Sequence, residues 1–430
     1  MNERIHNYET INTIKEVLIK TVNNYSNNVF LKLRKNNKIE EKKYKNLYED
    51  VKTLATGFLN MGLKDRKIAI IGDNSYEIAV SYLSIMCGVG VVVPINNKLS
   101  EDEIKKLLEE LQVNVIIFSE KYRNIINNLK EDTKVDIYIS IENDDLFSIK
   151  KIMIDGKKSL ENNNNIFDEI QIKNSDIIMI LKSRKNKANI IALSHKNICS
   201  NLMDIASVIE IYHEDVLLSV FPISNIFGFT LGFLYPIYKG SSILLYNSEK
   251  EILDDVKTHN ISSIIADKKF FEEIYKELLN YKNNKLNNIS QSKFSINSKR
   301  KAHKEMCKEL KKLTKFFICG TEILSEEIKQ KLSKIEIRCL QIYGGEETSP
   351  VISAENDKYE RFNSVGKILP SLQVKIEKKD NDKIGEIIVK GNSVIDKYFV
   401  NNQDNVVEDG WFHTGDYGYF DKDNYLYINK

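Results

Sequence analysis

Short apolar runs alternate along this chain with longer segments in which apolar residues recur at helical spacing. Residues 67–71 have the pattern of a strand and residues 76–87 that of a helix. Gly88 and Gly90 follow as helix stops, and residues 91–94 have the pattern of the next strand. Such alternation is typical of strand–helix–strand units, in which the strands pair in parallel. The pattern therefore predicts an α/β fold with mainly parallel sheets.

A chain of 430 residues is too long for one compact core, so several lobes are expected within one large domain, residues 1–430. The polar stretch 143–165 has the pattern of a loop or lobe boundary, which ends a first α/β lobe, residues 1–165. A second α/β lobe is expected over residues 166–342. Short strands separated by Asp, Asn and Gly turns follow, so residues 343–430 are expected to form a small β-rich lobe.

Capping and turn patterns define individual elements more closely. Ser100 and Glu103 form a capping-box pattern, which predicts a helix over residues 101–110. The strand expected after this helix covers residues 113–118. The strands expected in the β-rich lobe cover residues 372–376, 386–390, 418–420 and 425–428.

Composition limits the partners and the compartment. The chain has 63 Lys and Arg against 61 Asp and Glu, so its charge gives no reason to expect a nucleic-acid partner. Its five cysteines are widely spaced and lack a C-x-x-C pair, which predicts reduced cysteines acting as small hydrophobic residues. The first residues lack the apolar stretch of a signal peptide, so a cytoplasmic location is expected.

One stretch has the length of a membrane span, because residues 216–238 carry no charged side chain. Pro222 and Pro236 interrupt it, together with Asn225, Gly228 and Gly232. These interruptions favour a short strand over residues 217–221, a turn, and a buried helix over about residues 227–238.

The segment 282–315 is locally basic. Ala302, Met306 and Leu310 recur within it at helical spacing, which predicts an amphipathic helix whose basic face is solvated. The alternative is peripheral contact with an anionic membrane surface.

Several sequence blocks carry chemical information, and they occur in a fixed order. Residues 341–350 have the sequence Gln-Ile-Tyr-Gly-Gly-Glu-Glu-Thr-Ser-Pro, and residues 409–416 have the sequence Asp-Gly-Trp-Phe-His-Thr-Gly-Asp. Further blocks lie at residues 193–197, 363–367 and 385–391. In this order and spacing the chain resembles the adenylate-forming (AMP-binding) acyl-CoA synthetases, and most closely the bacterial long-chain fatty acid–CoA ligases. The resemblance runs nearly end to end, and several ordered blocks are far more specific than one short motif.

The resemblance implies the fold of the large N-terminal domain of these enzymes and a ligase that forms carbon–sulfur bonds. ATP and a carboxylic acid such as a fatty acid would first give an acyl-adenylate and pyrophosphate. A thiol, usually coenzyme A, would then accept the acyl group. ATP or AMP, Mg²⁺ and coenzyme A are thus the implied cofactors, and Mg²⁺ together with cationic or N–H donors would gather the triphosphate charge.

The resemblance also implies roles for individual residues. Glu347 would hold Mg²⁺, Asp416 would accept hydrogen bonds from the ribose hydroxyls, and Tyr343 would stack on the adenine. The residues that would border the adenine are Gly320, Thr321 and Glu322. Gly344 and Gly345 would allow close approach of the adenylate and the acyl chain, and the residues expected to face the acyl substrate are Asn225, Phe227 and Gly345.

The phosphate loop departs from the family pattern Tyr-Thr-Ser-Gly-Thr-Thr-Gly-x-Pro-Lys-Gly. Residues 180–190 occupy its place and contain none of its glycines, so the loop cannot easily turn its N–H groups onto a phosphate. The polar residues found there instead include Lys182, Ser183, Arg184, Lys185 and Lys187. Either these cations replace the N–H donors by charge, or the segment is a solvated loop that joins two strands, which is the favoured interpretation.

Three further departures affect the chemistry. Glu346 replaces the threonine that usually precedes the metal-binding glutamate, and a second carboxylate there would repel phosphate or raise one carboxyl pKa. Asn225 replaces the histidine that is usual in the turn after Pro222. The family's C-terminal domain, which supplies a lysine for adenylation, is expected to be missing after Lys430.

These observations leave three functional hypotheses. The first is an acyl-adenylate-forming ligase that is impaired as an isolated chain and is completed by a partner chain carrying the missing domain. The second is a catalytically dead homologue that binds an acyl group or nucleotide, or regulates an active paralogue. The third is a membrane-surface interaction protein that uses the basic segment 282–315.

Overall fold

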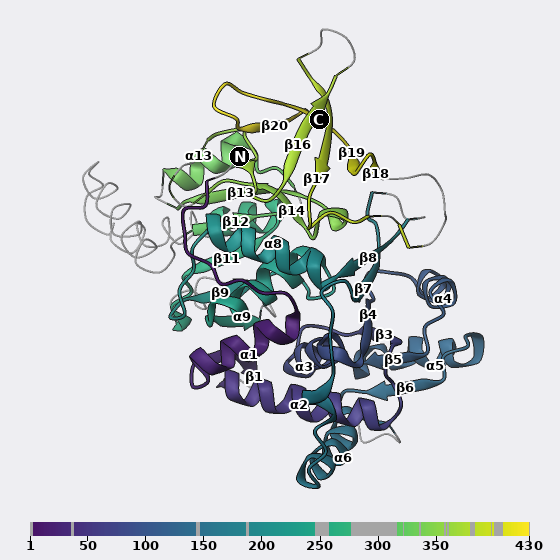
Figure 1. Cartoon of the computed structure of the whole chain (residues 1–430). Coiled ribbons are helices and arrows are strands. Elements are labelled where there is room, and N and C mark those ends of the chain that lie inside the picture. The colour runs from purple at the N-terminus through teal and green to yellow at the C-terminus, as the bar shows by residue number, and fades with distance from the viewer. Residues whose placement is uncertain are drawn as a thin grey trace, which may run out of the picture.

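The computed structural model of the chain contains three β-sheets, two of them large and flanked by helices (Figure 1). The structure describes residues 3–35, 38–142, 147–185, 189–245, 258–276, 316–320, 322–334, 337–356, 358, 361–378, 383–396, 398–399 and 407–429. The α/β fold class predicted from the sequence is confirmed.

The first large sheet has six strands, and all neighbouring pairs except the last are parallel. In sheet order the strands are β6 (Ile137–Ser140), β5 (Val115–Phe118), β3 (Arg66–Ile71), β4 (Gly90–Pro94), β7 (Ile177–Lys182) and β8 (Ile190–Ser194). The exception is β7–β8, which is an antiparallel hairpin. This hairpin carries the loop that occupies the place of the family's phosphate loop.

The second large sheet has nine strands and is parallel through its centre. In sheet order they are β15 (Lys367–Ile368), β14 (Val351–Ala354), β13 (Cys339–Gly344), β12 (Phe316–Cys319), β11 (Ser263–Ala266), β9 (Val216–Ser219), β10 (Ser242–Leu245), β1 (Val29–Lys35) and β2 (Lys38–Lys43). Strands β1 and β2 come from the N-terminal part of the chain, whereas β7 and β8 join the six-stranded sheet. The strands therefore do not divide between the two sheets at residue 165.

The third sheet has five antiparallel strands and lies at the top of Figure 1. Its strands are β16 (Gln373–Glu377), β17 (Gly385–Lys390), β18 (Val407–Glu408), β19 (Trp411–Phe420) and β20 (Leu426–Asn429). Strand β19 bulges away from β17, because Glu386 pairs with Tyr417 whereas Ile388 pairs with His413. The bulge contains Asp416, which the sequence analysis placed in the nucleotide site.

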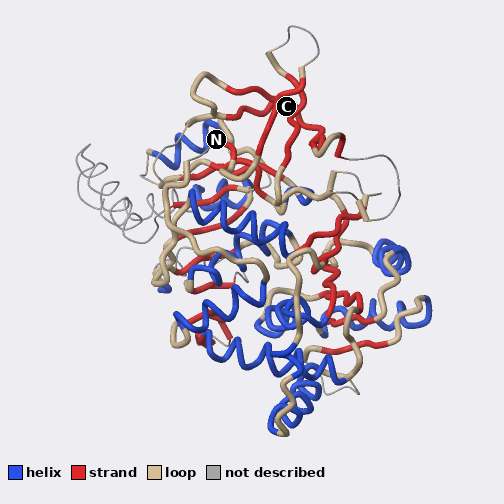
Figure 2. The backbone as a smooth tube through the Cα atoms, in the orientation of Figure 1, coloured by secondary structure: helices blue, strands red, loops and turns tan. Residues whose placement is uncertain are grey.

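Helices gather around the two large sheets, whereas the small sheet is built from strands and loops (Figure 2). The α-helices are α1 (Ile14–Tyr25), α2 (Tyr44–Asn60), α3 (Tyr76–Ser84), α4 (Glu101–Glu110), α5 (Arg123–Asp132), α6 (Ile149–Glu161), α7 (Ile166–Glu169), α8 (His195–Val208), α9 (Tyr235–Lys239) and α13 (Glu326–Ser333). Short turns of π-helix form η1 (Ile85–Val89) and η3 (Gly228–Leu234), and short 3₁₀ turns form η2 (Glu120–Tyr122) and η5 (Glu346–Thr348).

Elements with strong local signals match their predictions closely. The capping box is present at the start of α4, where Ser100 accepts from the Glu103 N–H and the Glu103 carboxylate accepts from the Ser100 N–H. Strand β3 and helix α3 lie where the apolar pattern put them, and Gly88 takes a φ of +118° where the helix was expected to end. The strands expected near residues 372–376, 386–390 and 425–428 are confirmed, whereas β19 is longer than the strand predicted at 418–420.

The prediction of a loop over residues 143–165 is wrong, because helix α6 covers most of this stretch. The helix begins after Ser148, whose hydroxyl accepts a hydrogen bond from the Lys151 N–H, and it packs against α2. A Cβ atom on Gly156 would lie 2.1 Å from the Thr53 carbonyl oxygen. The buried face of α6 is narrow and includes this glycine, so apolar periodicity did not reveal it.

The uncharged stretch 216–238 is divided as predicted. It forms β9, a turn, the π-helical turn η3 and the start of α9. None of the helices in the part of the chain that the structure describes is long and apolar enough to cross a bilayer. The basic segment 282–315 lies outside the described residues, so its two interpretations stay predictions.

The cysteines within the described ranges are buried and not joined by disulfides, as expected for small hydrophobic residues. They are Cys87, Cys199, Cys319 and Cys339. Burial raises the pKa of the Cys87 thiol to about 12, which keeps it protonated at neutral pH.

We expect Gly156→Ala to lower the free energy of unfolding by about 1–3 kcal/mol, because overpacking at a close helix crossing costs about this much. The gain in helix propensity, about 1 kcal/mol, acts in the opposite direction, so a net loss is diagnostic of the close contact. Urea denaturation followed by circular dichroism measures the change. Lys157→Ala, at the exposed neighbouring position, is the control and should change stability by less than about 0.5 kcal/mol. Equal stability of Gly156→Ala and wild type would contradict the packing of α6 on α2.

Candidate functional site

The loop of the β7–β8 hairpin faces three acidic residues, two of which the resemblance placed in a nucleotide site. The hairpin closes through the Ser183 N–H, which donates to the Asn189 carbonyl oxygen at 3.0 Å. Ser183 and the two residues after it then reach Glu347, Glu346 and Asp416 respectively. Lys187 belongs to the same loop and lies outside the described residues.

Glu347, the predicted Mg²⁺ ligand, is buried and bound to hydroxyl groups. The Ser183 hydroxyl donates to its Oε1 at 2.6 Å, and the Tyr398 hydroxyl lies 3.4 Å from the same oxygen. Burial raises the pKa of Glu347, while the hydrogen bond from Ser183 opposes the rise and the neighbouring Glu346 adds to it. Burial and the Glu347 carboxylate raise the pKa of Tyr398 to about 12, so the phenol stays a donor.

Glu346 is paired with the loop. The Arg184 Nε–H donates to its Oε1 at 2.6 Å, and the Glu346 side chain is only 7% exposed whereas that of Arg184 is 50% exposed. The arginine thus shields a buried carboxylate from the solvent side. The second carboxylate expected to repel phosphate is therefore balanced by a cation from the loop.

Asp416, the predicted ribose acceptor, already accepts two hydrogen bonds on one oxygen. The Lys185 ammonium lies 2.5 Å from Asp416 Oδ2 and 2.6 Å from the Thr414 carbonyl oxygen. The Tyr343 hydroxyl donates to the same Oδ2 at 2.7 Å. Burial, followed by the Asp416 charge, raises the pKa of Tyr343, so it remains a donor at neutral pH.

Local packing explains both glycines in residues 341–350. Gly344 adopts a φ of +157°, and a Cβ there would lie 1.9 Å from the Pro350 carbonyl oxygen. No other residue fits this close backbone approach. A Cβ on Gly345 would lie 3.3 Å from Glu347 Oε2, so this glycine keeps space open beside the buried carboxylate.

On the side predicted to border an adenine, Gly320 is buried and Glu322 is exposed, and Thr321 lies outside the described residues. Gln341 organises this turn, a role that sequence reasoning missed. Its Nε2 donates to the Cys319 and Glu322 carbonyl oxygens, and its Oε1 accepts from the Leu324 N–H at 2.9 Å. A polar residue within the apolar strand Cys339–Gly344 was the signal that could have indicated this role.

The residues predicted to face the acyl substrate separate into two environments. Asn225 lies in the turn after β9, where its Oδ1 accepts from the Phe227 N–H at 2.8 Å. Phe227 itself is buried, and a Cβ on Gly320 would lie 3.1 Å from its ring. Asn225 therefore borders open space, whereas Phe227 belongs to the core beneath the site.

A pocket of about 420 Å³ brings part of the predicted site together. Its polar lining includes Ser183, Arg184, Asn225 and Glu346, and its apolar lining includes Leu99, Leu107, Leu181 and Ile226. Tyr343, Asp416 and Gly320 do not line it. The pocket thus lies between the β7–β8 loop and the turn after β9.

Side chains of residues 193–197 form hydrogen bonds to the segments that surround the site. His195 accepts a hydrogen bond from the Ile14 N–H on Nδ1, and burial lowers its pKa to about 4, so it is neutral. The Asn197 side chain donates to the carbonyl oxygens of Asn392 and Val394. Helix α8 therefore connects the β7–β8 hairpin to the chain that follows the small sheet's strand β17.

The sequence profile described as "AMP-binding enzyme" matches residues 19–181 and 189–399. The chain belongs to the AMP-binding enzyme family. The resemblance to adenylate-forming enzymes noted from the sequence blocks is therefore confirmed. The residues between the two matched segments, 182–188, coincide with the β7–β8 loop, where the sequence departs from the family pattern.

Individual relatives agree with this assignment. The chain is 23% identical to the long-chain-fatty-acid–CoA ligase ACSBG2 of Rattus norvegicus over an alignment of 482 positions, gaps included, that covers 98% of this chain and 70% of that protein. Its fold is similar to that of a long-chain-fatty-acid–CoA ligase, FadD1, from Archaeoglobus fulgidus, with a TM-score of 0.83, 15% identity and coverage of 100% and 86% of the two chains. It is also similar to ATP-bound MatB from Rhodopseudomonas palustris, with a TM-score of 0.78, 18% identity and coverage of 97% and 78%.

We expect Glu347→Gln to raise the melting temperature at pH 7 by more than at pH 4. Burial puts the folded-state pKa of Glu347 above its ordinary value of 4.5, so the carboxyl favours the folded state when protonated. That contribution is present below the unfolded-state pKa and is lost as the pH rises through the folded-state pKa. Glutamine keeps an acceptor for Ser183 and carries no charge. Thermal denaturation at several pH values measures the difference.

Glu346→Gln is the matched control, because it removes the adjacent carboxylate but breaks the ion pair with Arg184. It should give no stabilisation at pH 7. A larger gain for Glu346→Gln than for Glu347→Gln would contradict the assigned direction of the pKa shift.

Proposed function

We propose that this chain is an acyl-CoA synthetase-like protein in which ATP-dependent activation of a carboxylic acid is impaired in the isolated chain. One observation carries the proposal. Ser183 and Lys185 already bind Glu347 and Asp416, which the family resemblance assigns to Mg²⁺ and ribose, and Arg184 binds the adjacent Glu346. A nucleotide must therefore compete with contacts made by the chain itself.

Adenylation requires that donors surround the triphosphate as charge moves onto the leaving pyrophosphate. The described part of the loop offers few such donors, because Arg184 Nε and the Lys185 ammonium are bound to carboxylates and the Ser183 N–H is bound to the Asn189 carbonyl oxygen. Residues 183–189 contain no glycine that would let the backbone turn toward a phosphate. We therefore expect the site to bind the phosphates of a nucleotide weakly.

Mg²⁺ does not fit the site in this conformation. Magnesium needs several oxygen ligands in near-octahedral geometry, but Glu347 is buried and its Oε1 accepts from a hydroxyl group. Glu346, the adjacent carboxylate, is engaged by Arg184. The raised pKa of Glu347 also disfavours the charged form that a cation requires.

The residues on the nucleoside side of the site match the family pattern better than those on the phosphate side do. Tyr343 and Asp416 lie together, and Lys185 is about half-exposed, so its ion pair with Asp416 is weak enough for a ligand to displace. Family membership and the ATP bound to the structurally similar MatB support AMP or ATP as the ligand to test. Coenzyme A as the acyl acceptor remains part of the proposal.

The carboxylic acid is proposed to enter the pocket beside Asn225. Its volume of about 420 Å³ falls within the range of about 300–1,000 Å³ that is typical of small-molecule sites. Leucine and isoleucine side chains supply an apolar wall, and Arg184 supplies a cation at one edge. The relatives named as long-chain-fatty-acid–CoA ligases support a fatty acid as the substrate class.

A second candidate function follows from the same contacts. A chain whose phosphate side is closed by its own side chains would serve as an acyl- or nucleotide-binding module, or as a regulator of an active paralogue. Completion by a partner chain, a cytoplasmic location and peripheral membrane contact stay predictions.

Pyrophosphate release tests the impaired enzyme directly. With ATP, Mg²⁺ and a panel of fatty acids, we expect the isolated chain to release pyrophosphate no faster than its Glu347→Ala variant. The reason is that removing positioned donors of this kind typically costs about 10²–10³ in rate each. Clear release above the Glu347→Ala control would contradict the proposed impairment and would establish an active ligase.

Calorimetry tests the nucleoside side. We expect weak AMP binding, with ATP binding no more than a few-fold tighter because the loop cations are engaged. Lys185→Met should strengthen AMP binding roughly 2- to 5-fold, since an exposed ion pair contributes about 0.2–1 kcal/mol. Lys196→Met, at an exposed lysine at the start of α8, is the charge-matched control and should leave AMP affinity unchanged. ATP binding that is much tighter than AMP binding in the wild type would mean that the loop cations hold phosphates.

A further inference from the structure

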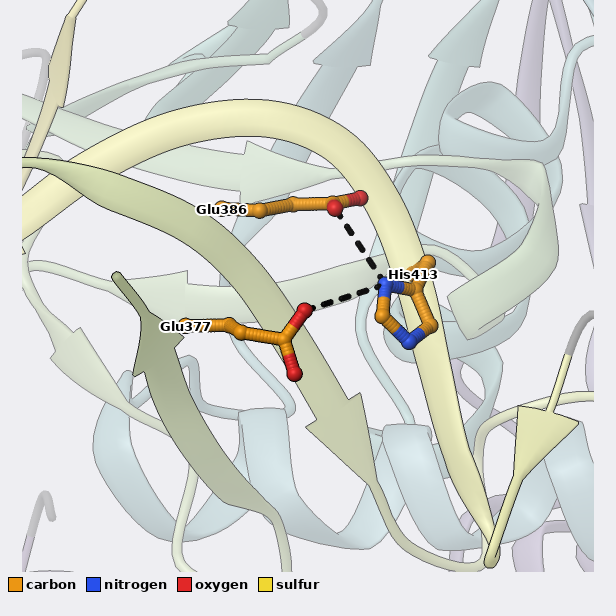
Figure 3. Close-up of side chains that lie close together, drawn as sticks. All are labelled: Glu377, Glu386 and His413. Atoms are coloured by element: carbon orange, nitrogen blue, oxygen red, sulfur yellow. Dashed lines mark hydrogen bonds and ion pairs between the residues drawn. The ribbon is translucent and has the colours of Figure 1, made fainter. Parts of the chain in front are cut away.

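Two carboxylates and one imidazole converge on the exposed face of the small sheet, as Figure 3 shows. The His413 Nδ1 lies 3.2 Å from Glu386 Oε2 and 3.9 Å from Glu377 Oε2. One ligand atom from each of the three residues lies within 4.8 Å of the other two. None of these side chains takes part in the contacts that Ser183, Arg184 and Lys185 make with the three acidic residues.

The sheet brings the three side chains together from three neighbouring strands. Glu377 and Glu386 are directly paired across β16 and β17. His413 joins them because β19 bulges after it, and the Gly415 N–H in the bulge donates to Glu386 Oε1 at 2.9 Å. This bond leaves Oε2 of Glu386 directed at His413 and holds the carboxylate in place.

The spacing fits a small metal ion. Ligands bound at about 2.0–2.1 Å in a tetrahedral arrangement lie about 3.3 Å from each other. The separations of 3.2 Å and 3.9 Å from His413 Nδ1 are close to this value, and all three ligand atoms lie within 4.8 Å of one another, so a small movement of the Glu377 side chain would bring them nearer to it. The Glu377 side chain is 58% exposed, so the core does not enclose it.

The charges of the two carboxylates also favour a metal ion at this position. Two carboxylates paired across neighbouring strands repel each other, which is destabilising unless a cation lies between them. Lys383 lines the adjacent hollow with both glutamates. A protonated His413 would relieve part of the repulsion, whereas a divalent ion would neutralise both carboxylates and use the imidazole as a neutral ligand.

We propose that Glu377, Glu386 and His413 form a binding site for a divalent transition-metal ion of the Zn²⁺ class. Imidazole nitrogen selects such ions over Mg²⁺, which prefers oxygen ligands. Three protein ligands leave one position of a tetrahedral ion open to water. The site is separate from Glu346 and Glu347 and does not depend on the proposed ligase function.

Zn²⁺ titration of the full chain after chelator treatment, without nucleotide, tests the site by calorimetry. We expect one ion per chain that is absent or at least 10-fold weaker in Glu377→Gln and in His413→Ala. Excess Mg²⁺ should not displace it. Because Glu377 is exposed on the sheet, its substitution by glutamine keeps the fold, which circular dichroism verifies for each variant.

His213→Ala is the matched control, since His213 also lies beside a glutamate, at 3.3 Å, but has no second carboxylate in the cluster. It should bind Zn²⁺ as the wild type does. Equal Zn²⁺ affinity in wild type, Glu377→Gln and His413→Ala, or no Zn²⁺ binding by the wild type, would overturn the proposal. Neither result would bear on pyrophosphate release, so the two proposals fail independently.

Discussion

The organisation of the site depends on the contacts between the β7–β8 loop and three carboxylates. The loop extends from the six-stranded sheet, Glu346 and Glu347 follow a strand of the nine-stranded sheet, and Asp416 belongs to the small sheet. Three sheets therefore meet through Ser183, Arg184 and Lys185. Removing one partner of such a pair leaves a buried or half-buried group without compensation, so loop and acids constrain each other. In relatives with a glycine-rich loop this position is expected to serve a nucleotide, whereas here it also joins the three sheets.

The sequence predicted those helices and strands that depend on residues close together in the chain. Helix α4 with its capping box, strand β3 and the division of the uncharged stretch 216–238 depend on nearby residues, so periodicity and capping signals were sufficient. Helix α6 was missed because its buried face is narrow and depends on a glycine crossing whose partner, α2, is far away in sequence. Four of the small sheet's five strands were recognised, but β18 and the bulge in β19 were not, and the bulge is defined by pairing with β17.

The candidate site illustrates the same limit. The resemblance identified Glu347, Asp416 and Tyr343 as residues of interest, and the structure brings the latter two into contact through one hydrogen bond. It could not reveal that Lys185 pairs with Asp416, because the two residues are 231 positions apart. Gly344 and His195 belong to sequence blocks that match the family pattern, but each also has a structural role, in backbone packing and in a buried hydrogen bond respectively. A motif match alone therefore does not show whether a residue serves ligand binding or the stability of the fold.

The place of β1 in the nine-stranded sheet has a consequence for how the chain folds as it is made. Leu31 in β1 pairs with Ile243 in β10, and β2 pairs only with β1 at the sheet edge. At synthesis rates of about 5–20 residues per second, β10 emerges roughly 10 to 40 s after β1. During that interval the nascent β1–β2 pair lacks its parallel neighbour, so one edge of β1 stays unpaired until β10 has been made.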